Sequence, residues 1–174
     1  VATKFFEHFI YIAHAVSNLH GNAGWSLWDE ADGFFYDVLH TPDDHHIPLK
    51  IRSFVGLVPL FSVETLEPDL LDRLPRFRRR MAWFIKYRPH LVENIASLTT
   101  TGQQERRLLA IPDRHQLERV LPRMLDETQF LSDYGLRTLS KQHQREPYTF
   151  AVNGHIHTVG YEPAESRTGL FGGN

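Results

Sequence analysis

The feature that most constrains the fold is the run Phe54–Phe61, which contains no charged or polar side chain. A helix that is apolar on all sides is normally buried on all sides, not laid on a surface. Pro59 should kink such a helix or lie in its first turn, and Ser53 is a plausible N-cap. We therefore expect residues 54–61 to form a helix enclosed by other elements.

Other segments have the pattern of helices that are apolar on one face. In residues 3–20 the apolar side chains recur in steps of three and four, and residues 21–24 (GNAG) should end that helix. An arginine-rich helix is expected between Pro75 and Pro89, with its charged face in solvent. One-face helices alternating with an all-apolar one predict a mainly α fold, a double ring of inner and outer helices.

Two hairpins are expected in the connections between these helices. Residues 34–39 and 47–51 have strand character and are joined by a turn-like Thr-Pro-Asp-Asp sequence. Residues 148–152 and 155–159 flank Asn153-Gly154, which is the preferred dipeptide of a tight hairpin turn.

Composition excludes several classes of function. The chain has 174 residues and a net charge of −2, which argues against a nucleic-acid or membrane-surface partner and suits a single domain. It has no cysteine, so thiolate chemistry is excluded, and we expect a cytoplasmic protein with the periplasm left open. His155 and His157 share a strand face, but no carboxylates complete a metal site there, so we expect neither metal nor cofactor.

The richest chemistry lies in residues 28–37 (WDEADGFFYD), which combine acids, aromatic rings and a glycine turn. Aromatic faces can cover the C–H face of a sugar ring while carboxylates accept hydrogen bonds from its hydroxyls. Glycoside hydrolysis needs two such carboxyl groups, and sites for it are built from acids, aromatic residues and arginines. The alternative is an acidic loop with a few core aromatics.

Four stretches, taken in order, resemble the catalytic (α/α)6 barrel of glycoside hydrolase family 63 and its bacterial glucosidase-like and mannosylglycerate-hydrolase-like relatives. They are LWDEADGFFYD at 27–37, RSFVGLVPLF at 52–61, YGLRTLS at 134–140 and YEPAES at 161–166. The resemblance implies an inverting, exo-acting, α-glucosidase-like enzyme. It implies that residues 1–174 are one segment of that barrel domain, truncated at both ends, with both catalytic carboxylates outside the chain.

On this resemblance the chain supplies only part of a sugar-binding wall. Trp28 either stacks on a sugar or covers its own loop, and Asp29 and Asp37 either bind hydroxyls or cap turns. Arg52 and Arg137 either reach the sugar or a catalytic carboxylate, or form salt bridges at helix ends. The predicted substrate-binding residues are Trp28, Asp29, Asp37, Arg52, Arg137 and Glu162, with no catalytic residue in the chain.

The expected partner is an oligosaccharide or a small glycoside, and the chain should be inactive alone. Exposed inner helices, above all residues 54–61, should also make it self-associate. Two alternatives from other classes remain open. They are a small helical protein-interaction domain without catalysis and a carbohydrate-binding module.

Overall fold

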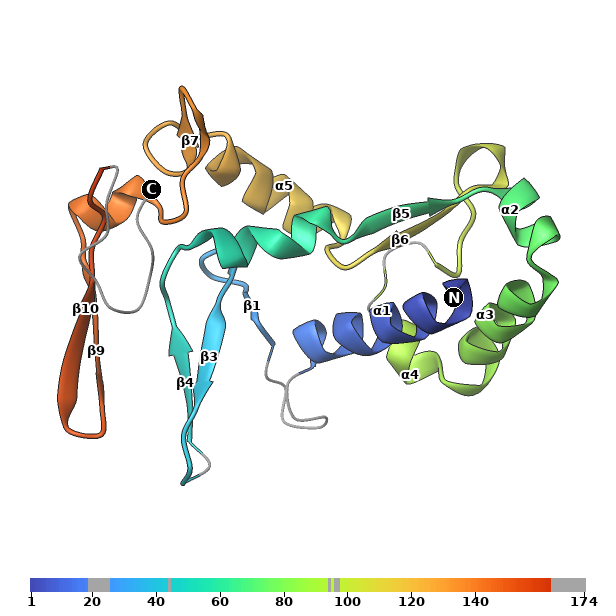
Figure 1. The fold of residues 1–174 in the computed structure, drawn as a ribbon, viewed down its shortest axis with the longest axis horizontal. Coiled ribbons are helices and arrows are strands. Elements are labelled where there is room, and N and C mark those ends of the chain that lie inside the picture. Colours follow the sequence, from blue (N-terminus) through green and yellow to red (C-terminus); the bar gives the residue numbers. More distant parts are fainter. Residues whose placement is uncertain (19–25, 44, 94, 96–97, 164–174) are drawn as a thin grey trace. The chain divides into compact units, whose positions relative to one another are not determined.

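The computed structural model describes residues 1–18, 26–43, 45–93, 95 and 98–163 (Figure 1). The chain divides into two compact units, which we describe separately. Unit 1 comprises Val1–Leu27 and Pro59–Leu117, and unit 2 comprises Trp28–Val58 and the chain from Glu118 onward. The predicted helix stop at residues 21–24 lies outside the described residues, and the 161–166 stretch is described only as far as Pro163.

Unit 1 is built on helices and one pair of strands. Its helices are α1 (Ala2–Ser17), α2 (Pro68–Arg73), α3 (Pro75–Tyr87) and α4 (Pro89–Val92), with a short 3₁₀ helix, η2 (Gln103–Glu105). Helices α2, α3 and α4 each begin with proline, whose fixed φ suits the first helical position. Strand β5 (Val63–Leu66) pairs antiparallel with β6 (Arg107–Ala110).

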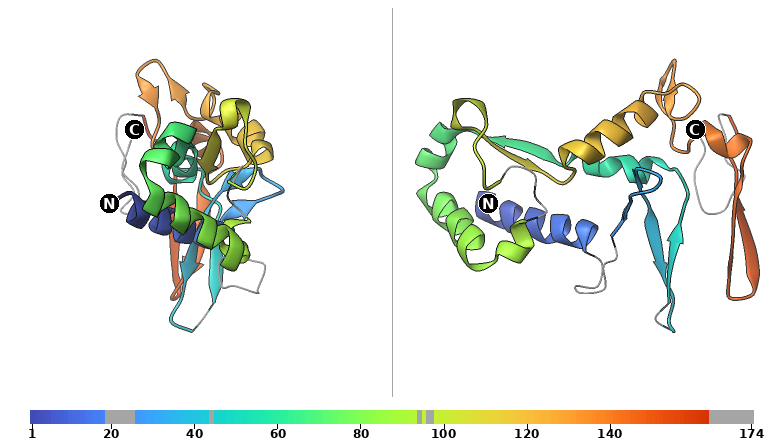
Figure 2. Two further views of the ribbon diagram at one scale, coloured as in Figure 1. Left: turned by 90° about the vertical axis from the view of Figure 1, so that its right-hand side faces the viewer. Right: turned by 180° about the vertical axis from the view of Figure 1, so that it is seen from behind.

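The core of unit 1 lies where α1 packs against α3 and α4 (Figures 1 and 2). Phe6 meets Phe77 and Phe84 edge-on, with ring centroids 5.2 and 6.1 Å apart. Glu7 of α1 accepts a hydrogen bond from Arg80 of α3 at 2.5 Å, beside these rings. The helix predicted over residues 3–20 is therefore present as α1, anchored by one apolar face.

Unit 2 consists mainly of small hairpins. Strand β1 (Trp28–Asp29) pairs with β2 (Phe34–Phe35), β3 (Asp37–His40) with β4 (His46–Leu49), β7 (Leu131–Ser132) with β8 (Gly135–Leu136), and β9 (Tyr148–Val152) with β10 (His155–Val159). The β9–β10 hairpin confirms the prediction. Asn153 and Gly154 both have positive φ, as a two-residue turn of this kind requires.

Three further elements complete the fold. They are the 3₁₀ helices η1 (Phe54–Phe61) and η3 (Lys141–Gln144) and the α-helix α5 (Arg114–Met124). The start of α5 is a reciprocal capping box. Asp113 Oδ1 accepts from the Gln116 backbone N–H at 2.8 Å, and Gln116 Oε1 accepts from the Asp113 N–H at 3.1 Å.

The prediction of a mainly α fold, an arc of an (α/α)6 toroid, is wrong. Helix accounts for 43% and strand for 24% of the structure, and the strands in its described part form five two-stranded antiparallel sheets. A toroid needs pairs of long helices, whereas only α1, α3 and α5 among the described helices exceed ten residues. The chain is an α+β mixture.

The wrong prediction of a helical toroid rests in part on the apolar run 54–61, whose pattern indicates an inner helix. Residues 54–61 are a 3₁₀ helix in which Leu57 is fully buried but Val55, Val58 and Phe61 are exposed. With three residues per turn, side chains three apart lie in one row, so a single side of the helix faces outward. The prediction of burial on all sides is therefore wrong for that row.

Candidate functional site

The acidic turn of residues 28–37 is held mainly by its own backbone and by one lysine. Asp29 Oδ1 accepts from the Asp32 N–H at 2.8 Å, and its other oxygen lies 2.8 Å from Lys50 Nζ. The Lys50 ammonium, with smaller help from the turn N–H groups, lowers the pKa of Asp29. Gly33, with φ of +61°, completes the turn. Of the two predicted roles for Asp29, the structure displays turn capping.

Two arginines on α5 also bind this turn, and sequence reasoning missed both. Arg119 donates to the backbone oxygens of Glu30 and Ala31, the latter at 3.0 Å, and to the Glu30 carboxylate at 2.9 Å. Arg123, one helical turn later, donates to the Asp32 carbonyl. Their spacing of four residues, which places both on one helix face, is the only signal in the sequence.

Trp28 and Asp37 lie at the two ends of the same stretch. Trp28 Nε1 donates to Glu30 Oε2 at 2.7 Å, and its ring packs on Phe35 with centroids 4.9 Å apart. Asp37 begins β3. Partial desolvation raises its pKa, although its side chain still reaches solvent. No hydrogen bond or ion pair to the Asp37 carboxylate forms within the described part of the chain.

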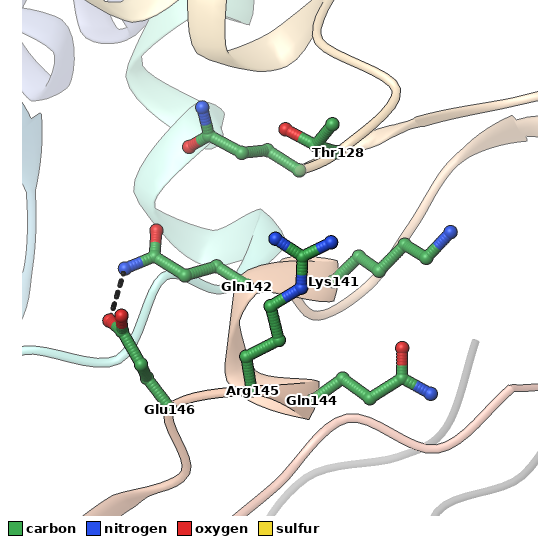
Figure 3. A pocket seen from close by; sticks show the side chains of 7 residues that line it. Thr128, Lys141, Gln142, Gln144, Arg145 and Glu146 are labelled. Carbon is green, nitrogen blue, oxygen red and sulfur yellow. Dashed lines mark hydrogen bonds between the residues drawn. The ribbon is translucent and has the colours of Figure 1, made fainter.

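Arg52 holds two residues that line a polar pocket of about 240 Å³, which we call the glutamine pocket. Its guanidinium donates to Tyr36 Oη and to Gln129 Oε1, both at 3.3 Å, and to Gln142 Oε1. Figure 3 shows Gln142 hydrogen-bonded to Glu146 on one side of this pocket. The pocket is lined by Thr128, Gln129, Lys141, Gln142, Gln144, Arg145 and Glu146.

Arg137 lies at a second hollow of about 560 Å³, which we call the tyrosine pocket. Its guanidinium donates to the carbonyls of Glu127 (3.0 Å), Gln129 (3.4 Å) and Leu131, and its Nε to Tyr161 Oη at 3.2 Å. These bonds fix the loop before β7 against the chain after β10. The pocket is lined by Glu127, Leu131, Ser132, Asp133, Tyr134, Arg137, Lys141, Tyr161 and Pro163.

The two pockets share the side chain of Lys141. Of the predicted residues, Arg137 lines the tyrosine pocket, whereas Arg52 lines neither pocket and contacts the glutamine pocket through Gln129 and Gln142. Glu162 lies between two residues that line the tyrosine pocket, whereas Trp28, Asp29 and Asp37 line neither. The glutamines were missed because no spacing rule marks them.

His143 supports Arg52 from within the core. Its Nε2 accepts from the Arg52 backbone N–H at 2.9 Å, so the ring must carry its proton on Nδ1, which lies 3.1 Å from the Glu146 carbonyl. The ring is buried. Desolvation of the charged form lowers the pKa of His143. A neutral imidazole therefore links the backbone of Arg52 to the backbone of Glu146, which lines the glutamine pocket.

This arrangement predicts a loss of stability in mild acid. The unfolded chain takes up a proton on His143 near pH 6.5, whereas the folded chain does so only at lower pH. The unfolded state then binds more protons, so the stabilisation present above about pH 6.5 is lost as pH falls toward the lowered pKa. In thermal melts at pH 7.5 and 5.5, the wild type should lose more melting temperature than His143→Gln, whose amide oxygen can still accept from Arg52. The exposed His155→Gln should behave as the wild type, and equal losses in all three would contradict the assignment.

Two classes of site receive no support from the geometry. Among the described residues, no group of three or more histidine, aspartate or glutamate side chains is placed to hold a metal ion. Across the described residues, no helix is both long and apolar enough to cross a bilayer.

Comparison with known proteins gives one similar protein. The chain is 43% identical, over 185 aligned residues and its entire length, to the Saccharomyces cerevisiae protein named Uncharacterized protein YMR196W. The chain spans only 17% of the length of that relative. No protein-family model matches the chain. No solved structure matches it either.

The resemblance to glycoside hydrolase family 63 is corrected by these findings. No family model matches the chain, the name of the yeast relative gives no glycosidase activity, and the fold is a mixture of helices and small hairpins. The motifs misled because they are short. Residues 27–37 build a turn held by Lys50 and two arginines, and residues 52–61 build a 3₁₀ helix.

Proposed function

We propose that unit 2 binds a neutral saccharide across the tyrosine and glutamine pockets. The single observation that carries the proposal is that Lys141 lines both hollows, which makes them neighbours on unit 2. The tyrosine pocket, at about 560 Å³, is within the usual size of small-ligand sites.

The chemistry of the lining suits a polyhydroxylated ligand. Tyr134 offers aromatic surface, because it is fully exposed at the tip of the β7–β8 hairpin, whereas Tyr161 is largely buried in the wall of the pocket. Gln129 and Gln142 each accept from Arg52 and donate to a carboxylate, which leaves each amide one lone pair and one N–H for the hydroxyls of a sugar. Aromatic faces and paired donors and acceptors together favour a sugar over a purely apolar ligand.

The charge of the combined surface favours a neutral ligand. Its cations are Arg137, Lys141 and Arg145, and its anions are Glu127, Asp133 and Glu146. The equal numbers leave no net field to attract a phosphate or a carboxylate. Among saccharides this supports a neutral sugar such as maltose or a methyl glucoside.

The test is calorimetric titration of the 174-residue chain with maltose and with methyl α-glucoside. We expect saturable binding, and Tyr134→Ala or Lys141→Ala should each weaken it by about tenfold, or ~1.4 kcal/mol. Both side chains are exposed, so the fold should survive. Tyr87→Ala and Lys86→Ala, which change exposed residues of unit 1, are the matched controls.

Two outcomes would contradict the proposal. One is absence of heat at high millimolar sugar, and the other is equal weakening by the unit 1 control variants. Hydrolysis of O-glycosyl bonds by a longer polypeptide that contains such a segment stays a prediction. Incubation of this chain with p-nitrophenyl α-glucoside should give no turnover, since binding alone is proposed for it.

A further inference from the structure

Unit 1 carries an apolar groove of about 480 Å³ that the saccharide proposal does not use. One wall is α1, and the other is formed by β5, β6, α2 and the start of α3 (Figure 1). Phe5 and Ile12 of the α1 wall are 72% and 54% exposed. Its lining is Ala2, Phe5, Phe6, His8, Phe9, Ile12, Glu64, Leu66, Leu70, Leu74, Phe77 and Leu109. Exposed apolar surface of this kind normally marks an interaction site.

Helix α1 has two neighbouring rows of apolar side chains, and the second row contributes to the core only in part, through Phe9 and Val16. Phe6, Ile10 and Ala13 are buried against α3 and α4. Beside them run Phe5, Phe9, Ile12 and Val16, spaced by four, three and four residues. This is the spacing with which one helix packs along another.

The groove is therefore shaped for a helix with the same kind of stripe. Leu70 and Leu74 are partly buried and lie opposite the α1 stripe, with Leu66 and Leu109 also lining the groove. The chain itself supplies a matching ridge in Phe5 and Ile12. A surface that contains both a ridge and its receiving groove is self-complementary, which is what a twofold interface requires.

The charges at the rim agree with such pairing. Lys4 and His8 follow one another along the α1 side, while the charged side chain of the opposite wall is Glu64. Among the residues that the structure describes, Lys4 forms no ion pair, and the hydrogen bond that Glu64 accepts is from the neighbouring Thr65 N–H at 3.2 Å. A twofold contact can bring Lys4 of each copy to Glu64 of the other.

We propose that a second copy of this chain occupies the groove, with the α1 stripe of each copy packed into the groove of the other. The interface is formed by unit 1 alone, so it does not depend on the sugar site. It also differs from the self-association predicted from the sequence, which was assigned to residues 54–61. Apolar packing supplies the affinity, and the Lys4–Glu64 pairs set the register.

The test is sedimentation velocity of the 174-residue chain over a range of micromolar concentrations. We expect a monomer–dimer equilibrium. Phe5→Glu and Ile12→Glu should each raise the dissociation constant by at least about tenfold, as expected for a central apolar contact. Ala15→Glu is the matched control, because Ala15 is an exposed apolar residue of the same helix that does not line the groove.

A charge exchange keeps the proposal falsifiable if the apolar variants fail to fold. Glu64→Lys alone should weaken the dimer, and Lys4→Glu combined with Glu64→Lys should restore it. A wild type that stays monomeric at every concentration would overturn the proposal. A dimer that is unchanged by Phe5→Glu, or weakened equally by Ala15→Glu, would assign the interface elsewhere and overturn it too.

Discussion

Replacing Gly56 with alanine should destabilise unit 2 by about 3 kcal/mol, as overpacking of a rigid core does. A Cβ at Gly56 would lie 2.3 Å from a ring carbon of Phe34 and 2.4 Å from the backbone oxygen of Phe35. Phe34 is fully buried and its ring stacks on Phe130 with centroids 5.8 Å apart. Neither the ring nor the strand can move without disturbing that stack, so the clash is not relieved by a flexible side chain.

Urea unfolding followed by circular dichroism measures this effect through the transition midpoint. Gly102→Ala is the matched control, because a Cβ there meets only the Arg106 backbone oxygen at an ordinary 3.7 Å. The control should differ from wild type by less than about 1 kcal/mol. Equal midpoints for the Gly56→Ala variant and the wild type would show that β2 and η1 are not packed as closely as described.

Truncating Phe84 to alanine should cost about 3–5 kcal/mol, the usual range for a phenylalanine removed from a core. Phe84 is buried, and its ring meets those of Phe6 and Tyr11 edge-on at 6.1 and 6.4 Å. Its removal leaves a cavity between α1 and α3 and also removes the surface on which the Arg80 guanidinium lies.

The measurement is a thermal melt combined with amide hydrogen exchange, which should lose protection in α1 and α3 first. Trp83→Ala is the control. It removes a larger ring from the position just before Phe84, but this ring is more than one-third exposed. Its cost should therefore be clearly smaller. A larger loss from Trp83→Ala than from Phe84→Ala would contradict the assignment of Phe84 to the core.

Features with a local cause could be predicted from the sequence. The β9–β10 hairpin follows from Asn153-Gly154, which tolerates the positive φ that its turn demands. The capping box at the start of α5 follows from the side chains of Asp113 and Gln116 alone. In each case the residues that decide the structure lie within a few positions of one another.

Features with a distant cause could not be predicted. The run 54–61 was expected to be enclosed, because hydrophobicity alone does not tell a 3₁₀ helix with one exposed row from a buried α-helix. The binding of the acidic turn by Arg119 and Arg123 joins residues about ninety positions apart. The residues around the two pockets could be predicted only in part, because their contacts also join distant positions of the chain. The arginines were chosen for their chemistry, but the glutamines that Arg52 meets carry no pattern.

The pairing of β5 with β6 has a consequence for when the groove can exist. The other four described sheets join strands that are neighbours in the chain, whereas β5 and β6 are separated by α2, α3, α4 and η2. Closing so long a loop carries an entropic cost that short hairpins avoid, so this pairing belongs to the slow end of folding. Leu66 and Leu109, one from each strand, line the groove. A chain that has not yet closed this loop has no surface to offer a second copy, and association through the groove therefore follows the folding of each copy.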